Sequence, residues 1–309
     1  MPPSTKALLF DIGGVVVLSP LAAISAYERA LALPPGYINS AIGAAAPHGA
    51  FQRLERSEMA LDERFFDEFG RDVRNRDVWE RITRTNNTNT TTSSNKVPAV
   101  GTQQKQDDFE IATARIDARA LFWTMMRAAR HPDPHVYPAL RKLVAVGRAR
   151  AASADPAAFV VGALSNAVVF PAGVRDERGE PSSSSSSGSG ARETSGNETT
   201  TAPIAPLFDT FLHSAHIGLR KPDPRVYALA LRRLEAVLRE RGCLAPDAAL
   251  RPEEVLFLDD IGGNLKAARA FGFRTCKVEI GRTREAVRVL EGAVGARLLD
   301  EADAGGSKL

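Results

Sequence analysis

The chain has few cysteines and no long apolar run. Its 309 residues include only two cysteines, Cys243 and Cys276. Neither lies in a Cys-x-x-Cys pair or a histidine-rich stretch, so we expect no disulfide framework and no zinc site. No stretch reaches the roughly 18 apolar residues that a membrane helix requires, so we expect no membrane partner. The apolar stretch 8–17 is interrupted by Asp11 and two glycines, and we expect no secretory signal.

A strong excess of charge of one sign is also missing. The chain has 40 basic and 37 acidic residues, a net charge of +3, which is too small to predict a nucleic-acid partner. The histidines lack the spacing of metal ligands, and we expect them on polar surfaces or loops. They are His48, His131, His135, His213 and His216.

Two segments are rich in Ser, Thr, Asn and Gln and poor in apolar residues. Residues 84–108 and 172–203 cannot bury enough apolar surface to offset the entropy of ordering, so we predict two disordered insertions. We predict a flexible tail at 296–309. Its last residues, Ser307-Lys308-Leu309, match the address that a peroxisomal import receptor reads. We therefore expect a peroxisomal location, or otherwise a cytoplasmic one.

Outside these segments, short apolar runs alternate with helical patterns. Alternation of this kind predicts a parallel sheet covered by helices on both faces. The helices include a single one at 109–129. The first two runs are more than 100 residues apart, which is too far for a simple crossover. We therefore predict a Rossmann-like α/β core, 1–19 plus 131–295, with a helical cap inserted at 20–130. The five expected strands are 6–12, 159–164, 208–214, 255–258 and 274–278.

Polar residues stand at or just beyond the ends of several expected strands. Because the carboxyl ends of parallel strands meet at one edge of a sheet, we expect their side chains to converge. Carboxylates bind a hard cation such as Mg²⁺. A hydroxyl, backbone N–H groups and an ammonium can hold phosphate oxygens, and a carboxylate can attack phosphorus. The set predicts phosphoryl transfer, and it consists of Asp11, Ser165, Asn166, Lys221, Asp259 and Asp260.

The motifs around these residues resemble the haloacid dehalogenase (HAD) superfamily of hydrolases. Within it they are similar to the group that includes the N-terminal phosphatase domain of soluble epoxide hydrolase. The segment 53–58 is similar to the cap segment of that family, and the resemblance implies the HAD fold. The four motifs are Phe10–Val16, Leu164–Asn166, Gly218–Tyr227 and Phe257–Arg269.

The resemblance implies a Mg²⁺ site at the first and last motifs. Asp11 would be the nucleophile and the first metal ligand, and Ile12 would offer its backbone carbonyl to the metal. Asp259 and Asp260 would bind or orient the ion, with Asp260 as the direct ligand. Asn264 would support their loop.

The resemblance also implies a site for a small phosphorylated substrate. Ser165 and the backbone N–H of Asn166 would bind the phosphate group. Lys221 would be catalytic, because its ammonium would neutralise the nucleophile and the phosphoryl oxygens. The oligomeric state is not predicted.

One position departs from the family pattern. Phosphatases of this family carry a second Asp two residues after the nucleophile, where this chain has Gly13. General acid–base help is worth about 10²–10⁴-fold in rate, so we expect slow, restricted or absent phosphatase activity. Glu55 and Glu58 are candidates to replace the missing acid, but we interpret them as surface charges or ion-pair partners. Metal-free dehalogenation and binding without catalysis stay open as alternatives.

Overall fold

The computed structural model describes residues 4–89, 102–170, 204–245 and 247–299. Five strands form one sheet in the order β3-β2-β1-β4-β5, and every neighbouring pair is parallel. This topology confirms the predicted α/β class. The strands are β1 (Ala7–Phe10), β2 (Val160–Ser165), β3 (Thr210–His213), β4 (Val255–Asp259) and β5 (Arg274–Lys277).

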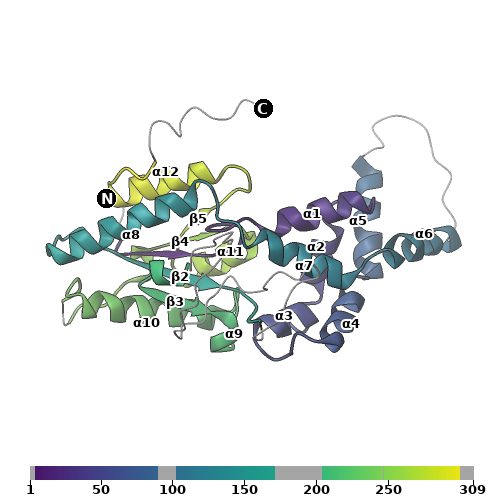
Figure 1. Cartoon of the computed structure of the whole chain (residues 1–309), viewed down its shortest axis with the longest axis horizontal. Helices are drawn as coiled ribbons and strands as arrows, with labels where there is room; N and C mark the ends of the chain where they lie inside the picture. The colour runs from purple at the N-terminus through teal and green to yellow at the C-terminus, as the bar shows by residue number, and fades with distance from the viewer. Residues whose placement is uncertain (1–3, 90–101, 171–203, 246, 300–309) are drawn as a thin grey trace, which may run out of the picture.

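The sheet is covered on both faces, as Figure 1 shows. In the central strand β1, Leu8 and Phe10 pack into one hydrophobic cluster with α8 and α12, while Ala7 and Leu9 pack into another with α10 and α11. Successive side chains of a strand point to opposite faces, and all four of these residues are fully buried. A strand buried on both faces explains the uninterrupted apolar run in the sequence. The covering helices are α8 (Val136–Ala152), α10 (Pro224–Glu240), α11 (Gly262–Phe271) and α12 (Thr283–Val294).

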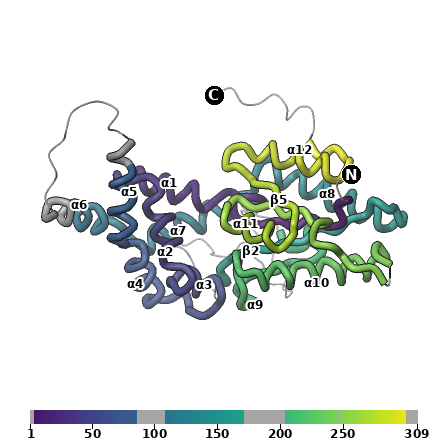
Figure 2. Tube along the Cα trace, turned by 180° about the vertical axis from the view of Figure 1, so that it is seen from behind, coloured from purple at the N-terminus to yellow at the C-terminus, as the bar shows by residue number. Residues whose placement is uncertain are grey.

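A second, entirely helical unit follows β1. It has its own hydrophobic core, in which the Phe65 ring stacks on Phe69 at 5.5 Å and meets Phe122 edge-on at 5.2 Å between ring centroids. Figures 1 and 2 show this cap gathered beside the sheet. Its helices are α1 (Pro20–Ala30), α2 (Tyr37–Ala44), α3 (Ala50–Glu55), α4 (Glu63–Asp72), α5 (Arg76–Asn89), α6 (Thr102–Ala114) and α7 (Ala118–Ala128).

Short helical turns adjoin the ends of two core strands. Helix α9 (Ser214–Ile217) directly follows β3, and the 3₁₀ turns η1 (Ala205–Leu207) and η2 (Pro252–Glu254) precede β3 and β4. No helix in the described ranges is both long and apolar enough to cross a bilayer.

Two sequence predictions about the cap need correction. The segment 84–108 is helical at both ends, because α5 continues to Asn89 and α6 begins at Thr102. The single helix expected at 109–129 is two helices. Asp117 begins the second one by accepting a hydrogen bond from the Ala120 N–H at 2.9 Å, which is the behaviour of an N-cap residue.

Several predicted segments lie outside the described residues. They are the centre of the first insertion (90–101), the insertion 172–203 and most of the tail, including Ser307-Lys308-Leu309. Import through this C-terminal tripeptide therefore stays a prediction.

Candidate active site

The sheet brings the predicted polar residues to one edge. Asp11 directly follows β1, Ser165 ends β2 and Asp259 ends β4. Strand β1 lies between β2 and β4, and the parallel register keeps the three strand ends level. Side chains that are about 95 to 250 positions apart in the chain therefore meet at one place, as parallel topology requires.

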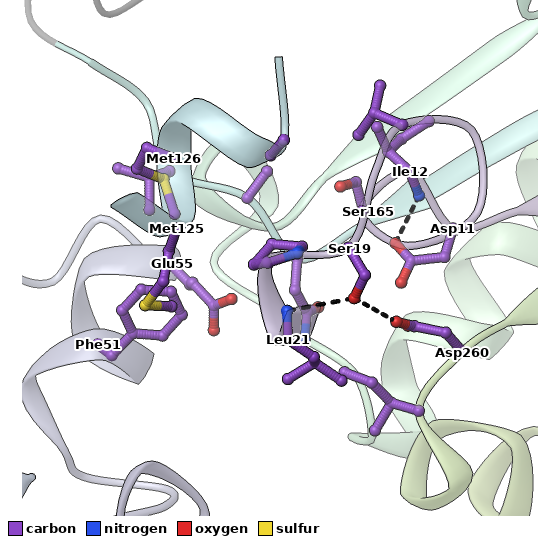
Figure 3. Close-up of a pocket in the computed structure, with 18 of the residues that line it drawn as sticks. Asp11, Ile12, Ser19, Leu21, Phe51, Glu55, Met125, Met126, Ser165 and Asp260 are labelled. Atoms are coloured by element: carbon purple, nitrogen blue, oxygen red, sulfur yellow. Dashed lines mark hydrogen bonds between the residues drawn. The ribbon is translucent and has the colours of Figure 1, made fainter. Parts of the chain in front are cut away.

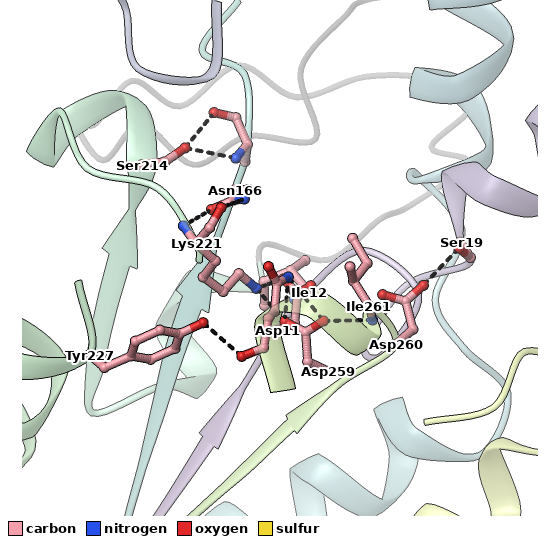
Figure 4. Close-up of polar contacts among 12 residues, drawn as sticks. Asp11, Ile12, Ser19, Asn166, Ser214, Lys221, Tyr227, Asp259, Asp260 and Ile261 are labelled. Carbon is pink, nitrogen blue, oxygen red and sulfur yellow. Dashed lines mark hydrogen bonds and ion pairs between the residues drawn. The ribbon is translucent and has the colours of Figure 1, made fainter. Parts of the chain in front are cut away.

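A buried lysine lies at the centre of this cluster. The Lys221 side chain is fully buried, and its Nζ lies 2.8 Å from Asp11 Oδ1 and 2.8 Å from Asp259 Oδ2. Figure 4 shows the ammonium between the two carboxylates. The Asn166 side chain holds the lysine backbone on both sides. Its Oδ1 accepts from the Lys221 N–H at 2.8 Å, and its Nδ2 donates to the Lys221 carbonyl at 3.0 Å.

Each aspartate oxygen in the cluster has a distinct environment. Asp11 Oδ1 accepts from Lys221 and from the Ile12 N–H at 2.6 Å, while Oδ2 makes no hydrogen bond with any described residue. Asp259 accepts from the Ile261 N–H at 2.7 Å and from Asn264 Nδ2 at 3.0 and 3.1 Å. The first carboxylate therefore keeps one oxygen free, and the second is fixed by its neighbours.

Asp11, Asp259 and Asp260 form a candidate metal site. One oxygen from each carboxylate lies within 4.8 Å of the others. Asp260 Oδ2 accepts from the Ser19 hydroxyl at 3.0 Å, whereas Oδ1 is buried and has no hydrogen-bond partner in the described part of the chain. A buried, unpaired carboxylate oxygen is costly. Three converging carboxylates are the oxygen ligands that Mg²⁺ prefers, so the residues fit this cation.

Burial and mutual repulsion perturb the charges of the cluster. Burial raises the pKa of Asp11 well above its usual range; Lys221 opposes this effect, and Asp259 and Asp260 reinforce it. Burial and Asp259 also raise the pKa of Asp260, to about 6. Burial alone would lower the pKa of Lys221, but Asp11 and Asp259 raise it above its usual value. One ammonium among three carboxylates leaves excess negative charge, which is the electrostatic condition for binding a cation.

Two glycines follow the first aspartate, and they differ in what surrounds them. Gly14 has a φ of +80°, and a Cβ placed there would lie 2.0 Å from Asp260 Oδ2. Only glycine leaves room for Asp260 at this position. A Cβ at Gly13 would make only an ordinary contact, 3.6 Å from Pro20 Cδ. The loop therefore has room for a side chain at the position where the sequence lacks the expected acid.

The carbonyl of Ile12 does not fit its predicted role. It accepts hydrogen bonds from the N–H groups of Val16 at 2.9 Å and Val17 at 3.0 Å, and a longer one from Val15 at 3.3 Å. A carbonyl oxygen has two lone pairs, and these donors occupy them. We therefore do not include Ile12 among the proposed metal ligands.

A cavity of about 270 Å³ opens onto the cluster and lies between the core and the cap. Its polar end includes Asp11, Ser165, Asn166 and Asp260. Cap residues line the opposite side, as Figure 3 shows for several of them. The apolar lining residues from the cap include Leu21, Ile24, Ile42, Phe51, Met125 and Met126. A largely apolar cavity with a few converging polar groups is typical of a small-molecule site.

The cap also contributes a charged residue to the cavity wall. Glu55, at the end of α3, lines the cavity and is only 5% exposed. Its Oε2 accepts from Arg220 Nε at 2.8 Å, so the ion-pair interpretation is confirmed and the surface interpretation is wrong. Glu58 forms an exposed pair with Arg56. His213, expected on a polar surface or loop, is buried at the end of β3.

Sequence reasoning missed Ser19 and Arg220. Ser19 begins α1 as its N-cap, where its hydroxyl also meets Asp260. The signal for this residue was present, because Ser followed by Pro is a common helix start. Arg220 directly precedes Lys221 in the third motif, but nothing in the local pattern indicates that it pairs with the cap.

The sheet order, the helical insertion after β1 and the motif residues at the strand ends agree with the HAD-like fold that the sequence motifs imply. Part of the chain is also homologous to bifunctional epoxide hydrolase 2. For the Sus scrofa protein the identity is 38% over 96 residues, which are 31% of this chain and 14% of that protein. Acyl-CoA dehydrogenase family member 10 from Mus musculus is 40% identical over 88 residues, 28% of this chain and 7% of that protein. The chain thus matches only a small part of these relatives, and no family model matches it.

Some solved structures align along most of this chain, but with low TM-scores and low sequence identity. A HAD-like family hydrolase from Porphyromonas gingivalis has a TM-score of 0.42 and 15% identity, with 93% of this chain and 98% of that chain covered. A HAD family enzyme from Bacteroides thetaiotaomicron, in complex with magnesium and inorganic phosphate, has a TM-score of 0.36 and 15% identity, with 90% and 96% covered.

Proposed function

We propose that this chain is a Mg²⁺-dependent HAD hydrolase that removes phosphate from a small phosphorylated metabolite. The main observation in support is the cluster of Asp11, Asp259 and Asp260 with the buried ammonium of Lys221, at the polar end of a cavity between the core and the cap. The unpaired Oδ1 of Asp260 supports a cation as the missing partner. Partial homology to a protein named as an epoxide hydrolase is compatible with hydrolysis as the reaction class.

In the proposed reaction, the free Oδ2 of Asp11 attacks phosphorus and forms an aspartyl-phosphate. Lys221 holds the other oxygen of Asp11, so the nucleophile is oriented before the substrate arrives. Ser165 and the backbone N–H of Asn166 bind the phosphoryl oxygens. Asp11 and Asp260 would hold Mg²⁺, with Asp259 supporting, and the bound ion would supply positive charge that stabilises the transferring phosphoryl group.

The test is phosphate release from p-nitrophenyl phosphate with Mg²⁺ and with EDTA. We expect Asp11→Asn to reduce turnover to the background rate, because an amide oxygen cannot serve as the nucleophile. Asp67→Asn provides a matched control, since Asp67 is exposed on α4, and it is expected to keep wild-type activity. The proposal would be refuted if turnover were the same with Mg²⁺ and with EDTA, and the same in Asp11→Asn as in the wild type.

One observation favours a second candidate, carbon–halogen hydrolysis. The observation is the absence of an acidic side chain at Gly13. A halide leaves without being protonated, so this reaction does not need a general acid at that position. This reaction does not require a cation, however, so it would not explain the cluster of three carboxylates. Chloride release from a 2-haloacid that persists in EDTA would select this alternative.

A further inference from the structure

We infer that Glu55, from the cap, is the proton donor to the leaving group and so performs the task for which Gly13 has no side chain. This inference rests on the proposed phosphatase function. It gives the cap a catalytic residue in addition to a wall of the cavity.

The direction of attack places the leaving group toward the cap. In an in-line displacement the attacking and leaving oxygens lie on opposite sides of phosphorus. With Asp11 attacking from the sheet edge, the leaving oxygen points into the cavity, away from β1. Glu55 lines the same cavity, and Figure 3 shows its carboxylate directed into the space across from Asp11.

Glu55 is held firmly while one oxygen remains available. Its backbone carbonyl accepts from the Ser214 hydroxyl at 2.6 Å, and its Oε2 accepts from Arg220 at 2.8 Å. Its Oε1 has no hydrogen-bond partner among the residues that the structure describes. An anchored carboxyl group with one free oxygen in a substrate cavity has the geometry of a general acid.

The surroundings of Glu55 favour its protonated form more than water does. Burial raises the pKa of this carboxyl group, and the nearby charges of Arg220, Lys221 and Arg56 oppose the effect without cancelling it. A general acid works best when its pKa is moved toward the working pH. The electrostatics therefore act in the direction that the geometry requires.

The proton and electron changes balance in two steps. First, Asp11 Oδ2 forms a bond to phosphorus, the phosphorus–oxygen ester bond breaks, and Glu55 gives its proton to the departing alkoxide, which leaves as the alcohol. Second, water attacks the phosphorus of the aspartyl-phosphate and loses a proton to the Glu55 carboxylate. Asp11 departs as a carboxylate, inorganic phosphate is released, and Glu55 is protonated again.

The test compares two esters that differ in their need for an acid. A p-nitrophenolate leaves readily without protonation, whereas the alkoxide of ethyl phosphate does not. We expect Glu55→Gln to reduce kcat/KM for ethyl phosphate by about 10²–10⁴-fold and for p-nitrophenyl phosphate by much less. The ratio kcat/KM is used because it reports the steps up to loss of the alcohol. Glu58→Gln, at an exposed neighbouring position, is expected to change neither value.

Further variants separate catalysis from structure. Arg220→Gln breaks the same ion pair but keeps the carboxyl group, so kcat/KM for ethyl phosphate is expected to fall less than it does in Glu55→Gln. Adding Gly13→Asp to Glu55→Gln is expected to restore ethyl phosphate hydrolysis, because the loop has room for a side chain there.

Three outcomes would count against the inference. An equal loss for the two esters in Glu55→Gln would overturn it and leave the proposed phosphatase function intact, provided that turnover depends on Asp11. A wild-type protein that hydrolyses only the aryl ester would also overturn it. If neither ester shows turnover that depends on Asp11, the inference and the proposed function both fail.

Discussion

Replacing Gly14 by alanine tests how closely the loop after β1 is fitted to Asp260. The new Cβ would lie 2.0 Å from Asp260 Oδ2 and 2.5 Å from its Cγ, at a residue with φ of +80°. The left-handed conformation costs an L-residue about 1–2 kcal/mol. If the clash breaks the hydrogen bond from Ser19 to the Asp260 carboxylate, the free energy of unfolding falls by about 1.5–3 kcal/mol more.

The expected result is a free energy of unfolding about 2.5–5 kcal/mol below wild type, as the sum of these two terms. The displaced Asp260 is also expected to weaken Mg²⁺ binding by about 10–100-fold, the usual cost of disturbing a metal-site shell. Urea unfolding measures the first quantity, and calorimetric titration with Mg²⁺ measures the second.

Gly13→Ala is the matched control, because it adds the same methyl group one position earlier. Its Cβ would meet only Pro20, at 3.6 Å, and Gly13 does not have a positive φ. At such a site the change to alanine is expected to be neutral or to stabilise by up to about 1 kcal/mol. Equal stability and equal Mg²⁺ affinity in the two variants would refute the steric reasoning.

Two further predictions concern buried charge. Lys221→Met removes the cation between Asp11 and Asp259, so in metal-free buffer at pH 7 it is expected to lower the free energy of unfolding by about 3–5 kcal/mol. Lys266→Met, at an exposed position of α11, is the control. A loss below about 1 kcal/mol in Lys221→Met would contradict the prediction. The second group is His213, whose pKa is lowered from 6.5 to about 4 by burial and by the neighbouring His216. As the pH falls below 6.5, this histidine therefore binds a proton in the unfolded chain before it does so in the folded chain, and the free energy of unfolding decreases. Between pH 7 and 5 this group is expected to remove about 2 kcal/mol, and urea unfolding of His213→Gln is expected to lack that loss; an unchanged pH dependence would show that His213 is not responsible.

Local patterns in the sequence were sufficient to place the strands and the polar residues that follow them. Apolar runs such as 6–12 mark strands buried on both faces, and parallel strands must align their carboxyl ends. Asp11, Ser165 and the pair Asp259-Asp260 could therefore be brought together from the sequence alone. The break at Asp117 was missed, because a helical pattern on both sides concealed a capping residue.

Only the tertiary structure decided which groups face the cavity. Glu55 and Arg220 are 165 positions apart, and the local sequence around a charged residue on a short helix does not predict the surface against which that residue will pack. The carbonyl of Ile12 was expected to face a metal, yet the turn that follows it occupies that oxygen with backbone N–H groups. Burial and partner choice depend on how the cap packs against the sheet, and this packing is a property of the whole fold. For that reason the sequence alone located the proposed nucleophile and cation ligands, and the folded chain was needed to choose Glu55 over Glu58 as the candidate for the missing acid.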